Sequence, residues 1–439
     1  MTELYRPIVL PVLQSRHTLL VTFHSSLIMY LRHLSLTNFR TYARLELDLP
    51  AQAILLHGDN AQGKTSLLEA IYVLATGRSS HTASDRQLIH WLASEESHTP
   101  YARLVADVVR KDRAGADRPL HIEMVLMLEP ANTEDGWRFR KQIKVNGAVV
   151  KGAALIGQIA VVMFLPDDVE IVSGGPSNRR RYLDSVLAQV DAEYVEALEL
   201  YADVLARRNA LLKQLAEAGG AANAADQLIY WDEQLARSGA LITLRRQAAI
   251  AELETLADQR HRTLTSERHN LHLRYQPSFS PDQPRTPIYQ RSLNLDLPTQ
   301  SPEATLAQAQ AAYLKQLAAR RGEELARGAT LVGPHRDELR FIADEIDLGT
   351  FGSRGQQRTA VLALKLAEVH WLRAKIGDWP ILLLDEVMAE LDMNRRGFLL
   401  NQINGAHQSI LTGTDPEMFA ADFRAHAKLL RVVRGRIED

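Results

Sequence analysis

Apolar and polar positions alternate along the chain between residue 29 and about residue 175. This period of two is typical of strands with one buried face, and it predicts strands in four short segments. The segments are 34–36, 45–47, 104–109 and 121–128. Asn146-Gly147 tolerates positive φ and predicts a hairpin turn after Val145. The first part of the chain is therefore expected to be rich in strands.

One predicted helix interrupts these strands. The apolar run 53–56 is typical of a buried strand, and residues 65–76 follow it without proline or glycine. Apolar residues cover this second segment on nearly every side, which indicates a helix buried from all directions. They are Leu67, Leu68, Ala70, Ile71, Val73 and Leu74. We expect a central helix with other elements packed around it.

A helical period replaces the alternation from about residue 176 to residue 270. One face of its first helix carries Leu183, Val186, Leu187 and Val190. Gly219-Gly220 predicts a break between helices. Residues 276–303 are rich in proline and polar residues and predict a loop, and another helix is expected over 306–327. Strands and helices alternate again in the remaining chain.

The segment between the strand and the central helix matches G-x-x-x-x-G-K-[ST], the phosphate-binding P-loop. Its residues are Gly58, Asp59, Asn60, Ala61, Gln62, Gly63, Lys64 and Thr65. The glycines let backbone N–H groups surround phosphate oxygens, and the helix N-terminus adds positive potential. We expect Lys64 to reach the β- and γ-phosphates of ATP and the Thr65 hydroxyl to bind Mg²⁺.

A second motif supplies the carboxylates that such a site needs. Residues 381–384 form an apolar run that ends in Asp385-Glu386, the Walker B pattern. One carboxylate holds Mg²⁺ and a second orients the attacking water. We assign the first role to Asp385 and the second, catalytic role to Glu386. Asp392 follows a few residues later, and we expect it to contact the nucleotide.

Ser353-Arg354-Gly355-Gln356 lies between these motifs, ahead of a helix predicted to end near residue 375. Ser353 is well placed as the N-cap of that helix. The order Ser-x-Gly-Gln, helix and Walker B resembles the signature of ABC ATPases, whose serine contacts the γ-phosphate on the opposite subunit. The resemblance implies a catalytic role for Ser353 and nucleotide contacts from Gly355 and Gln356. It also implies a head-to-tail homodimer that encloses two ATP molecules.

These motifs predict an α/β fold, a P-loop ABC-type ATPase head with mixed sheets around the central helix and an inserted, mostly α-helical second lobe. We expect residues 29–175 and 328–439 to form the ATPase lobe and residues 176–327 to form the helical lobe. Residues 1–28 are expected to be a disordered tail or an upstream extension ahead of a real start at Met29.

Composition narrows the class of protein. The chain has 439 residues, of which 46% are hydrophobic, enough for a packed core in two or three lobes. Cysteine is absent, which excludes disulfides and thiolate metal sites and fits a reducing compartment. No apolar run approaches the length of a membrane span. The net charge of −2 means that any DNA-binding surface must be a local patch.

Motifs along the whole chain together resemble the RecF family, whose members are DNA-repair ATPases of the ABC/SMC type. The motifs are Asn38-Phe39-Arg40, the P-loop with Leu68-Glu69-Ala70-Ile71-Tyr72, Gly333-Pro334-His335-Arg336-Asp337, the segment from Ser353 to Arg358, the Walker B acids and Thr412-Gly413-Thr414. The resemblance covers roughly 29–436, and the motifs stand in the order of the family.

The resemblance implies a function that composition and spacing do not give. It implies ATP-dependent dimerisation on DNA, preference for duplex at single-strand gaps, and cooperation with RecO and RecR to load RecA. It also implies a cytoplasmic location and links to DNA replication, recombination and the SOS response. We expect slow, DNA-stimulated hydrolysis of ATP that acts as a release switch.

The chain also departs from the transporter form of these motifs. Arg354 stands where the transporter signature has glycine, and no histidine follows the predicted strand 409–411. Thr412 or Thr414 is expected to take the place of that histidine. No glutamine fits the Q-loop; Gln142 and Gln158 are poor matches.

Arginine clusters in the helical segment are candidate phosphate contacts. They are Arg179-Arg180-Arg181, Arg207-Arg208 and Arg320-Arg321. A solvated helix face is the more common reading of any single pair. Arg179 to Arg181 is the best candidate for contact with DNA or with a second subunit. The motif from Gly333 to Asp337 is expected to be structural or to lie near the nucleotide interface.

Other classes share the ATP chemistry. A transporter ATPase subunit would keep its P-loop and signature much closer together than they are here. An SMC-like tether would need far longer heptad arms than the helical insertion provides. A non-enzymatic architectural protein that only binds ATP is a further alternative, against which Glu386 argues.

Overall fold

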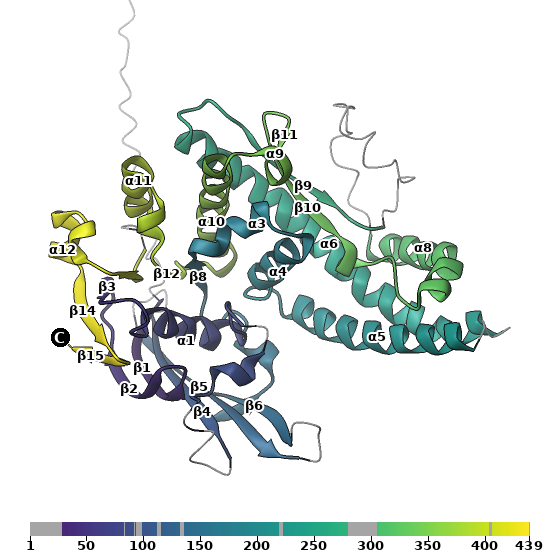
Figure 1. Cartoon of the computed structure of the whole chain (residues 1–439), viewed down its shortest axis with the longest axis horizontal. Helices are drawn as coiled ribbons and strands as arrows, with labels where there is room; N and C mark the ends of the chain where they lie inside the picture. The colour runs from purple at the N-terminus through teal and green to yellow at the C-terminus, as the bar shows by residue number, and fades with distance from the viewer. Residues whose placement is uncertain are drawn as a thin grey trace, which may run out of the picture.

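The computed structural model describes residues 29–438 apart from residues 83, 92, 94–98, 112–115, 132–135, 219–222, 280–304 and 404–405. The expected tail 1–28 therefore lies outside the described residues. So do Gly219 and Gly220 and most of the predicted proline-rich loop. The strands β1 to β6 and β14 lie on the left in Figure 1, and long helices extend away from them to the right.

A six-stranded, mainly parallel sheet carries the predicted nucleotide motifs. Its strands, in spatial order, are β15 (Arg436–Glu438), β14 (Lys428–Val433), β3 (Ala53–His57), β13 (Ser409–Gly413), β12 (Ile381–Leu384) and β8 (Val161–Phe164). β3 pairs in parallel with both β13 and β14, and β12 lies between β13 and β8. The strand before the P-loop and the strand before the Walker B acids are thus separated by one strand.

A six-stranded antiparallel sheet lies on the other side of the central helix. Its strands, in spatial order, are β2 (Tyr42–Asp48), β1 (Met29–Phe39), β4 (Tyr101–Lys111), β5 (Asp117–Pro130), β6 (Trp137–Val145) and β7 (Ala148–Val150). All four strand segments that the alternation predicted lie in it. Asn146 and Gly147 have φ of 50° and 82° at the β6–β7 turn, which confirms the predicted hairpin.

The predicted central helix is α1 (Lys64–Thr76), which packs between the two sheets. Its apolar residues are buried on both sides, and it ends at Gly77 with φ of 72°. Residues of β3 show how the parallel sheet joins two cores. Ile54 and Leu56 belong to the core around α1, whereas Leu55 belongs to the core under the helical lobe. Strands apolar on both faces are typical of a covered parallel sheet.

A mostly helical part of the chain begins directly after β8, at Pro166, ahead of the expected boundary at residue 176, and its helices continue past the expected boundary at residue 327. Its helices are η3 (Pro166–Val169), α3 (Glu170–Ser173), α4 (Pro176–Leu187), α5 (Ala192–Glu217), α6 (Ala224–Leu264), α8 (Leu306–Arg327), η4 (Pro334–Arg336), α9 (Leu348–Phe351) and α10 (Arg354–Ile376). α8 has the bounds that the sequence predicted. α10 packs against α6 and returns the chain to the parallel sheet. In Figure 1, α5 and α8 lie at the opposite end of the molecule from α12 (Ala421–His426).

A three-stranded sheet in this lobe was not predicted. Its strands are β11 (Ile346–Asp347), β10 (Glu338–Ala343) and β9 (Leu271–Gln276). β9 pairs with β10, which follows it by more than 60 residues. Residues 271–276 alternate between apolar and polar positions, but the segment is short and its partner strand is distant, and the helical stretch was expected to end at residue 270 with no strand predicted after it.

Short helices connect the remaining strands. They are η1 (Asp85–Leu88), η2 (Gly152–Leu155), η5 (Val387–Glu390), α11 (Met393–Ile403) and η6 (Pro416–Met418). Within the described ranges, no helix combines the length and the apolar character needed to cross a membrane.

A candidate nucleotide site

The P-loop connects β3 to α1 and needs its glycines. Gly58 and Gly63 have φ of 145° and 112°, a region that side chains other than glycine rarely adopt. A Cβ atom on Gly58 would lie 2.4 Å from the carbonyl oxygen of Val432, and one on Gly63 would lie 2.8 Å from Thr41 Oγ1. The chain near Thr41 and Val432 therefore packs closely against both glycines, and the loop leads directly into the N-terminus of α1.

Lys64 is 3% exposed and folds back over the loop. Its Nζ donates to the carbonyl oxygens of Gly58 and Asp59 at 2.7 and 2.9 Å. Nζ also lies 3.2 Å from Glu386 Oε1, and the Glu386 side chain is 36% exposed. The structure thus brings the P-loop lysine and the second Walker B acid into one ion pair.

Thr65 and Asp385 meet although 320 residues separate them. Thr65 Oγ1 lies 3.0 and 2.8 Å from the two carboxylate oxygens of Asp385. A hydroxyl and a carboxylate are hard oxygen donors, the class that Mg²⁺ prefers. Mg²⁺ sites of this kind take one or two carboxylates and complete their coordination with phosphate and water. The two predicted metal ligands therefore fit a magnesium ion.

The signature segment lies at the exposed end of α10. Ser353 Oγ accepts from the Gln356 backbone N–H at 3.3 Å, and the Ser353 N–H donates to Gln356 Oε1 at 2.8 Å. This confirms Ser353 as an N-cap. Ser353, Arg354, Gly355 and Gln356 are all exposed. In the described part of the chain, no hydrogen bond joins this end of α10 to the P-loop.

Asp392 also lies apart from the P-loop residues. It caps the start of α11, where its Oδ1 accepts from the Arg395 backbone N–H at 3.0 Å. Its carboxylate also pairs with the Arg395 guanidinium at 3.1 Å. The structure therefore brings together Lys64, Thr65 and the two Walker B acids. It leaves Asp392 and the signature residues outside this group.

The remaining P-loop residues differ in whether they are exposed or contact the rest of the protein. Asp59, Asn60 and Ala61 are exposed. Gln62 instead holds the turn between β14 and β15. Its Oε1 accepts from the Arg434 backbone N–H at 2.7 Å, and its carbonyl oxygen accepts from the Gly435 N–H at 2.9 Å. The polar groups of Gln62 thus tie the loop to the C-terminal hairpin, which the sequence did not reveal.

The turn between β1 and β2 supports the P-loop from the other side. The buried Tyr42 hydroxyl donates to the Gly63 carbonyl oxygen at 3.0 Å, and burial raises the pKa of Tyr42 above its usual range. Arg40 forms a two-pronged ion pair with Glu69 of α1, both bonds at 2.8 Å. Arg40 and Glu69 belong to two motifs noted in the sequence, and their pairing joins these motifs in space.

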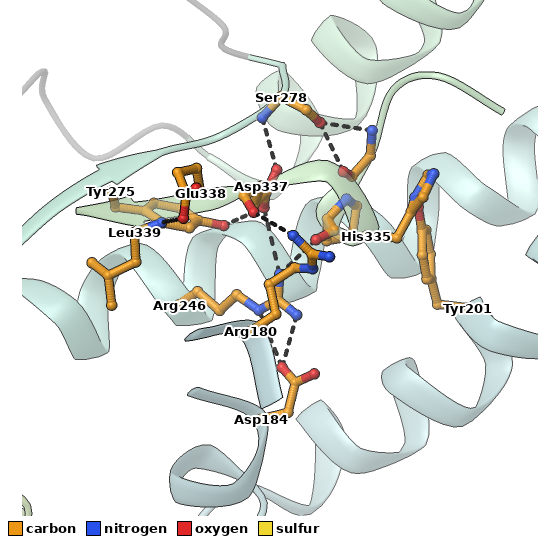
Figure 2. Close-up of polar contacts among 12 residues, drawn as sticks. Arg180, Asp184, Tyr201, Arg246, Tyr275, Ser278, His335, Asp337, Glu338 and Leu339 are labelled. Atoms are coloured by element: carbon orange, nitrogen blue, oxygen red, sulfur yellow. Dashed lines mark hydrogen bonds and ion pairs between the residues drawn. The ribbon is translucent and has the colours of Figure 1, made fainter. Parts of the chain in front are cut away.

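The motif from Gly333 to Asp337 lies beside α6 and β9, and Figure 2 shows the polar contacts around its last residue, Asp337. The Asp337 carboxylate is fully buried and accepts from the Tyr275 hydroxyl and from the Ser278 N–H. Arg246 Nη1 lies 3.6 Å from the same carboxylate, and Arg180 donates to the Asp337 carbonyl oxygen at 2.9 Å. These contacts confirm a structural role for the motif.

The arginine clusters are mostly used inside the protein. Arg179 is buried and bonds Glu338 at 2.6 and 2.8 Å. Arg208 is 0% exposed and pairs with Asp232 and Glu324, both at 2.8 Å. The interpretation as phosphate contacts or solvated positions is wrong for these two arginines, because both are buried and their guanidinium groups are already paired with carboxylates inside the protein.

The other arginines of these clusters differ in exposure. Arg181 is exposed, and Arg207 pairs with Asp203 on the surface of its own helix. Arg321 contacts Asp232, the carboxylate that also binds Arg208. Arg320 pairs with Glu323 one turn along α8. Arg181 is the member of the best candidate cluster that keeps its side chain exposed.

The structure distinguishes the two threonines that were expected to take the place of the transporter histidine. Thr412 is buried at the end of β13, between the two Walker B acids. Thr414 is exposed, and its hydroxyl lies 3.9 Å from Met418 Sδ. Thr412 is therefore the threonine that reaches the site.

Comparison with known proteins identifies the family to which the chain is similar. The family model described as the RecF/RecN/SMC N terminal domain matches residues 30–436. The DNA replication and repair protein RecF of Chloroflexus aggregans is 40% identical over 416 residues, which cover 93% of this chain and 99% of that protein. Its counterpart in Herpetosiphon aurantiacus is 40% identical over 412 residues, with the same coverage of both chains.

Solved structures agree as well. A structure described as the recombination mediator protein RecF-ATP in the RecFOR pathway has a TM-score of 0.76 and 29% identity. It covers 95% of this chain and 99% of that chain. The fold is accordingly that of an ABC-type ATPase head with a helical lobe. The family match along nearly the whole sequence and the shared fold show that this chain belongs to the RecF family.

Proposed function

We propose that the chain is an ATPase of DNA replication and repair, acting in the RecFOR pathway. The observation that carries this proposal is the meeting of Lys64, Thr65, Asp385 and Glu386, from two distant parts of the chain, beside a P-loop. Family membership supports the DNA-repair part, because the relatives are named DNA replication and repair protein RecF.

The four residues have distinct roles in the proposed reaction. Lys64 and the backbone N–H groups of the P-loop bind the β- and γ-phosphates of ATP. Thr65 and Asp385 would hold Mg²⁺, which neutralises charge on those phosphates when bound. Glu386 orients a water molecule toward the γ-phosphorus and accepts its proton. The water oxygen forms a bond to the γ-phosphorus while the bond from phosphorus to the β–γ bridging oxygen breaks, and ADP and phosphate leave.

A second copy of the chain completes the site in this proposal. Ser353, Gly355 and Gln356 stand at an exposed helix N-terminus, which attracts anions. Phe351, two residues before Ser353, is 77% exposed. An exposed aromatic side chain beside exposed signature residues supports a surface that is covered in an assembly. We infer a head-to-tail homodimer in which each signature segment contacts the ATP held by the other P-loop.

The proposed partners follow from the family. ATP closes the dimer on DNA where duplex meets a single-strand gap, and slow hydrolysis releases it. The closed dimer acts with RecO and RecR to load RecA in the cytoplasm. The name of the RecFOR pathway in the matched structures supports this assignment.

Steady-state turnover of ATP, with and without gapped duplex DNA, tests the enzyme part of this proposal. We expect slow turnover that gapped DNA accelerates and that Lys64→Arg abolishes. Fast turnover that DNA leaves unchanged would contradict the switch, and turnover equal in Lys64→Arg would contradict the site.

A further inference from the structure

Thr412 connects the two Walker B acids through a single hydroxyl. It is the second-last residue of strand β13 and is 1% exposed. Its Oγ1 donates to Asp385 Oδ1 at 2.8 Å and accepts from the backbone N–H of Glu386 at 2.9 Å. One oxygen atom therefore contacts both Walker B acids.

Only a hydroxyl group can make this pair of bonds at this position. A hydroxyl carries one proton to donate and lone pairs to accept. Valine has nearly the same shape as threonine but can do neither. The remaining polar neighbour of Oγ1, the Leu384 carbonyl oxygen, lies at 3.5 Å, too far for a strong bond. The single proton of the hydroxyl is thus donated to Asp385, and one of its lone pairs accepts from Glu386.

The Glu386 backbone explains why this support matters. The Asp385 N–H still donates to the Phe164 carbonyl oxygen of β8, so the strand ladder reaches that residue. At Glu386 the chain turns into the left-handed region, with φ of 49° and ψ of 13°. Such a conformation is rare for a residue other than glycine or asparagine, and it persists where surrounding contacts hold it. The Glu386 N–H no longer points to a neighbouring strand and donates to Thr412 Oγ1 instead.

The two oxygens of the Asp385 carboxylate have different contacts. Thr412 and Thr65 both contact Oδ1, whereas Oδ2 contacts Thr65 at 2.8 Å. With Oδ1 held from the β13 side, the carboxylate plane is fixed relative to Thr65, the other expected metal ligand.

We propose that Thr412 is a positioning residue that sets the orientation of the metal-binding carboxylate and the backbone turn of the general base together. The proposal rests on the proposed ATPase function and adds to it a residue that couples β13 to both acids. Thr412 acts through these residues and does not itself contact the γ-phosphate, because its hydroxyl is already committed.

Three variants test this role. Thr412→Val removes the hydroxyl at nearly constant shape, and Thr412→Ser keeps the hydroxyl without the methyl group. Thr414→Val is the matched control, since Thr414 is exposed two residues away. For each variant, kcat and KM for ATP are measured together with binding of a fluorescent ATP analogue across a Mg²⁺ titration and in EDTA. Thermal unfolding shows that each variant is folded.

For Thr412→Val we expect kcat to fall about tenfold or more, the size expected for lost hydrogen bonds to charged groups. The Mg²⁺ concentration that gives half of its effect on analogue binding should rise, while binding in EDTA stays within about twofold of wild type. Thr412→Ser should restore both quantities, and Thr414→Val should match wild type.

Two outcomes separate the inference from the function on which it rests. If Thr412→Val keeps the kcat and the Mg²⁺ dependence of wild type, or if Thr412→Ser fails to restore them, the positioning role is wrong. If wild type binds the analogue with Mg²⁺ but does not hydrolyse ATP, the proposed ATPase is wrong. The Mg²⁺ titration of binding still decides the role of Thr412 in that case.

Discussion

Two clusters of charged side chains in this molecule differ in how far their members are exposed to solvent. In the helical lobe, Arg208, Asp232 and Glu324 enclose one another with side chains 0%, 5% and 0% exposed. In the nucleotide site, the buried Lys64 pairs with Glu386, whose side chain is 36% exposed. The first cluster is closed and satisfied. In the second, open cluster, Glu386 is partly exposed to solvent, so Lys64 can exchange this carboxylate for a phosphate group.

The difference separates groups that specify the fold from groups that do chemistry. A closed network of buried charges is costly to break, because each removed partner leaves an uncompensated charge. An open network loses less stability on substitution but loses its function. Substitutions in the two clusters should therefore affect different quantities.

Glu386→Gln should give the largest effect on the open side. We expect kcat for ATP hydrolysis to fall about 10²- to 10⁴-fold, the usual contribution of a general base. ATP binding should remain, since Lys64 and Thr65 are intact, and the free energy of unfolding should change little. Single-turnover hydrolysis and ATP binding measure the two quantities. Unchanged turnover would remove Glu386 from the catalytic role.

Arg208→Met should give the largest effect on the closed side. It leaves Asp232 and Glu324 buried without Arg208, and we expect a loss of about 3–5 kcal/mol in the free energy of unfolding. Denaturant unfolding measures this loss. The control is Arg207→Met, next along the chain, whose exposed pair with Asp203 should contribute less than about 1 kcal/mol. Equal effects of the two variants would show that the enclosed network adds no stability.

His335 should make stability depend on pH. Nδ1 accepts from the Tyr201 hydroxyl at 2.6 Å, and Nε2 faces the Thr330 carbonyl oxygen at 3.2 Å, so the neutral ring satisfies both. Burial lowers the pKa of His335 to about 4, and nearby arginines add to the effect.

The unfolded chain therefore binds a proton between about pH 6.5 and pH 4 that the folded chain does not. The stabilisation is complete above pH 6.5 and is lost as pH falls toward 4, by up to about 3 kcal/mol. His335→Gln should flatten this part of the curve of unfolding free energy against pH. The exposed control His426→Gln should leave the curve as in wild type. A curve for His335→Gln as steep as wild type would contradict the assignment.

Phe351→Ser should give the smallest of these effects and should act on assembly alone. If a second copy covers this side chain, its loss weakens ATP-dependent self-association by about 1–2 kcal/mol. The monomer should unfold as wild type does, because the side chain is 77% exposed. Tyr230→Ser, on a side chain 60% exposed in α6, is the matched control. Equal association of both variants would place Phe351 outside the dimer interface.

The sequence predicted the parts of the fold that local pattern determines. The alternating strands, the all-apolar α1, the Asn146-Gly147 turn and the Ser353 cap each depend on neighbouring residues, and the structure confirms all of them. β9 was missed although its six residues alternate between apolar and polar positions, because it is short and follows a long helical stretch, and its pairing with β10 far along the chain is not visible in the local sequence.

The same distinction applies to the site. Motif spacing identified Lys64, Thr65, Asp385 and Glu386, and the fold brings them together. It did not show that Thr412 joins the two acids, since that contact depends on the order of strands in the sheet.

The arginine pairs illustrate the same limit. Arg207 and Arg208 are adjacent in sequence, yet one is exposed and the other fully enclosed. Carboxylates on α6 and α8 decide the difference, and no pattern within α5 reports their presence.

Sedimentation of wild type and Lys64→Arg, with no nucleotide, with ATP–Mg²⁺ or with ADP, tests the central proposal most directly. Each condition is measured with and without gapped duplex DNA. We predict that wild type dimerises on DNA with ATP but not with ADP, and that Lys64→Arg stays monomeric. Wild type that remains monomeric and free of DNA in every condition would contradict the ATP-gated dimer.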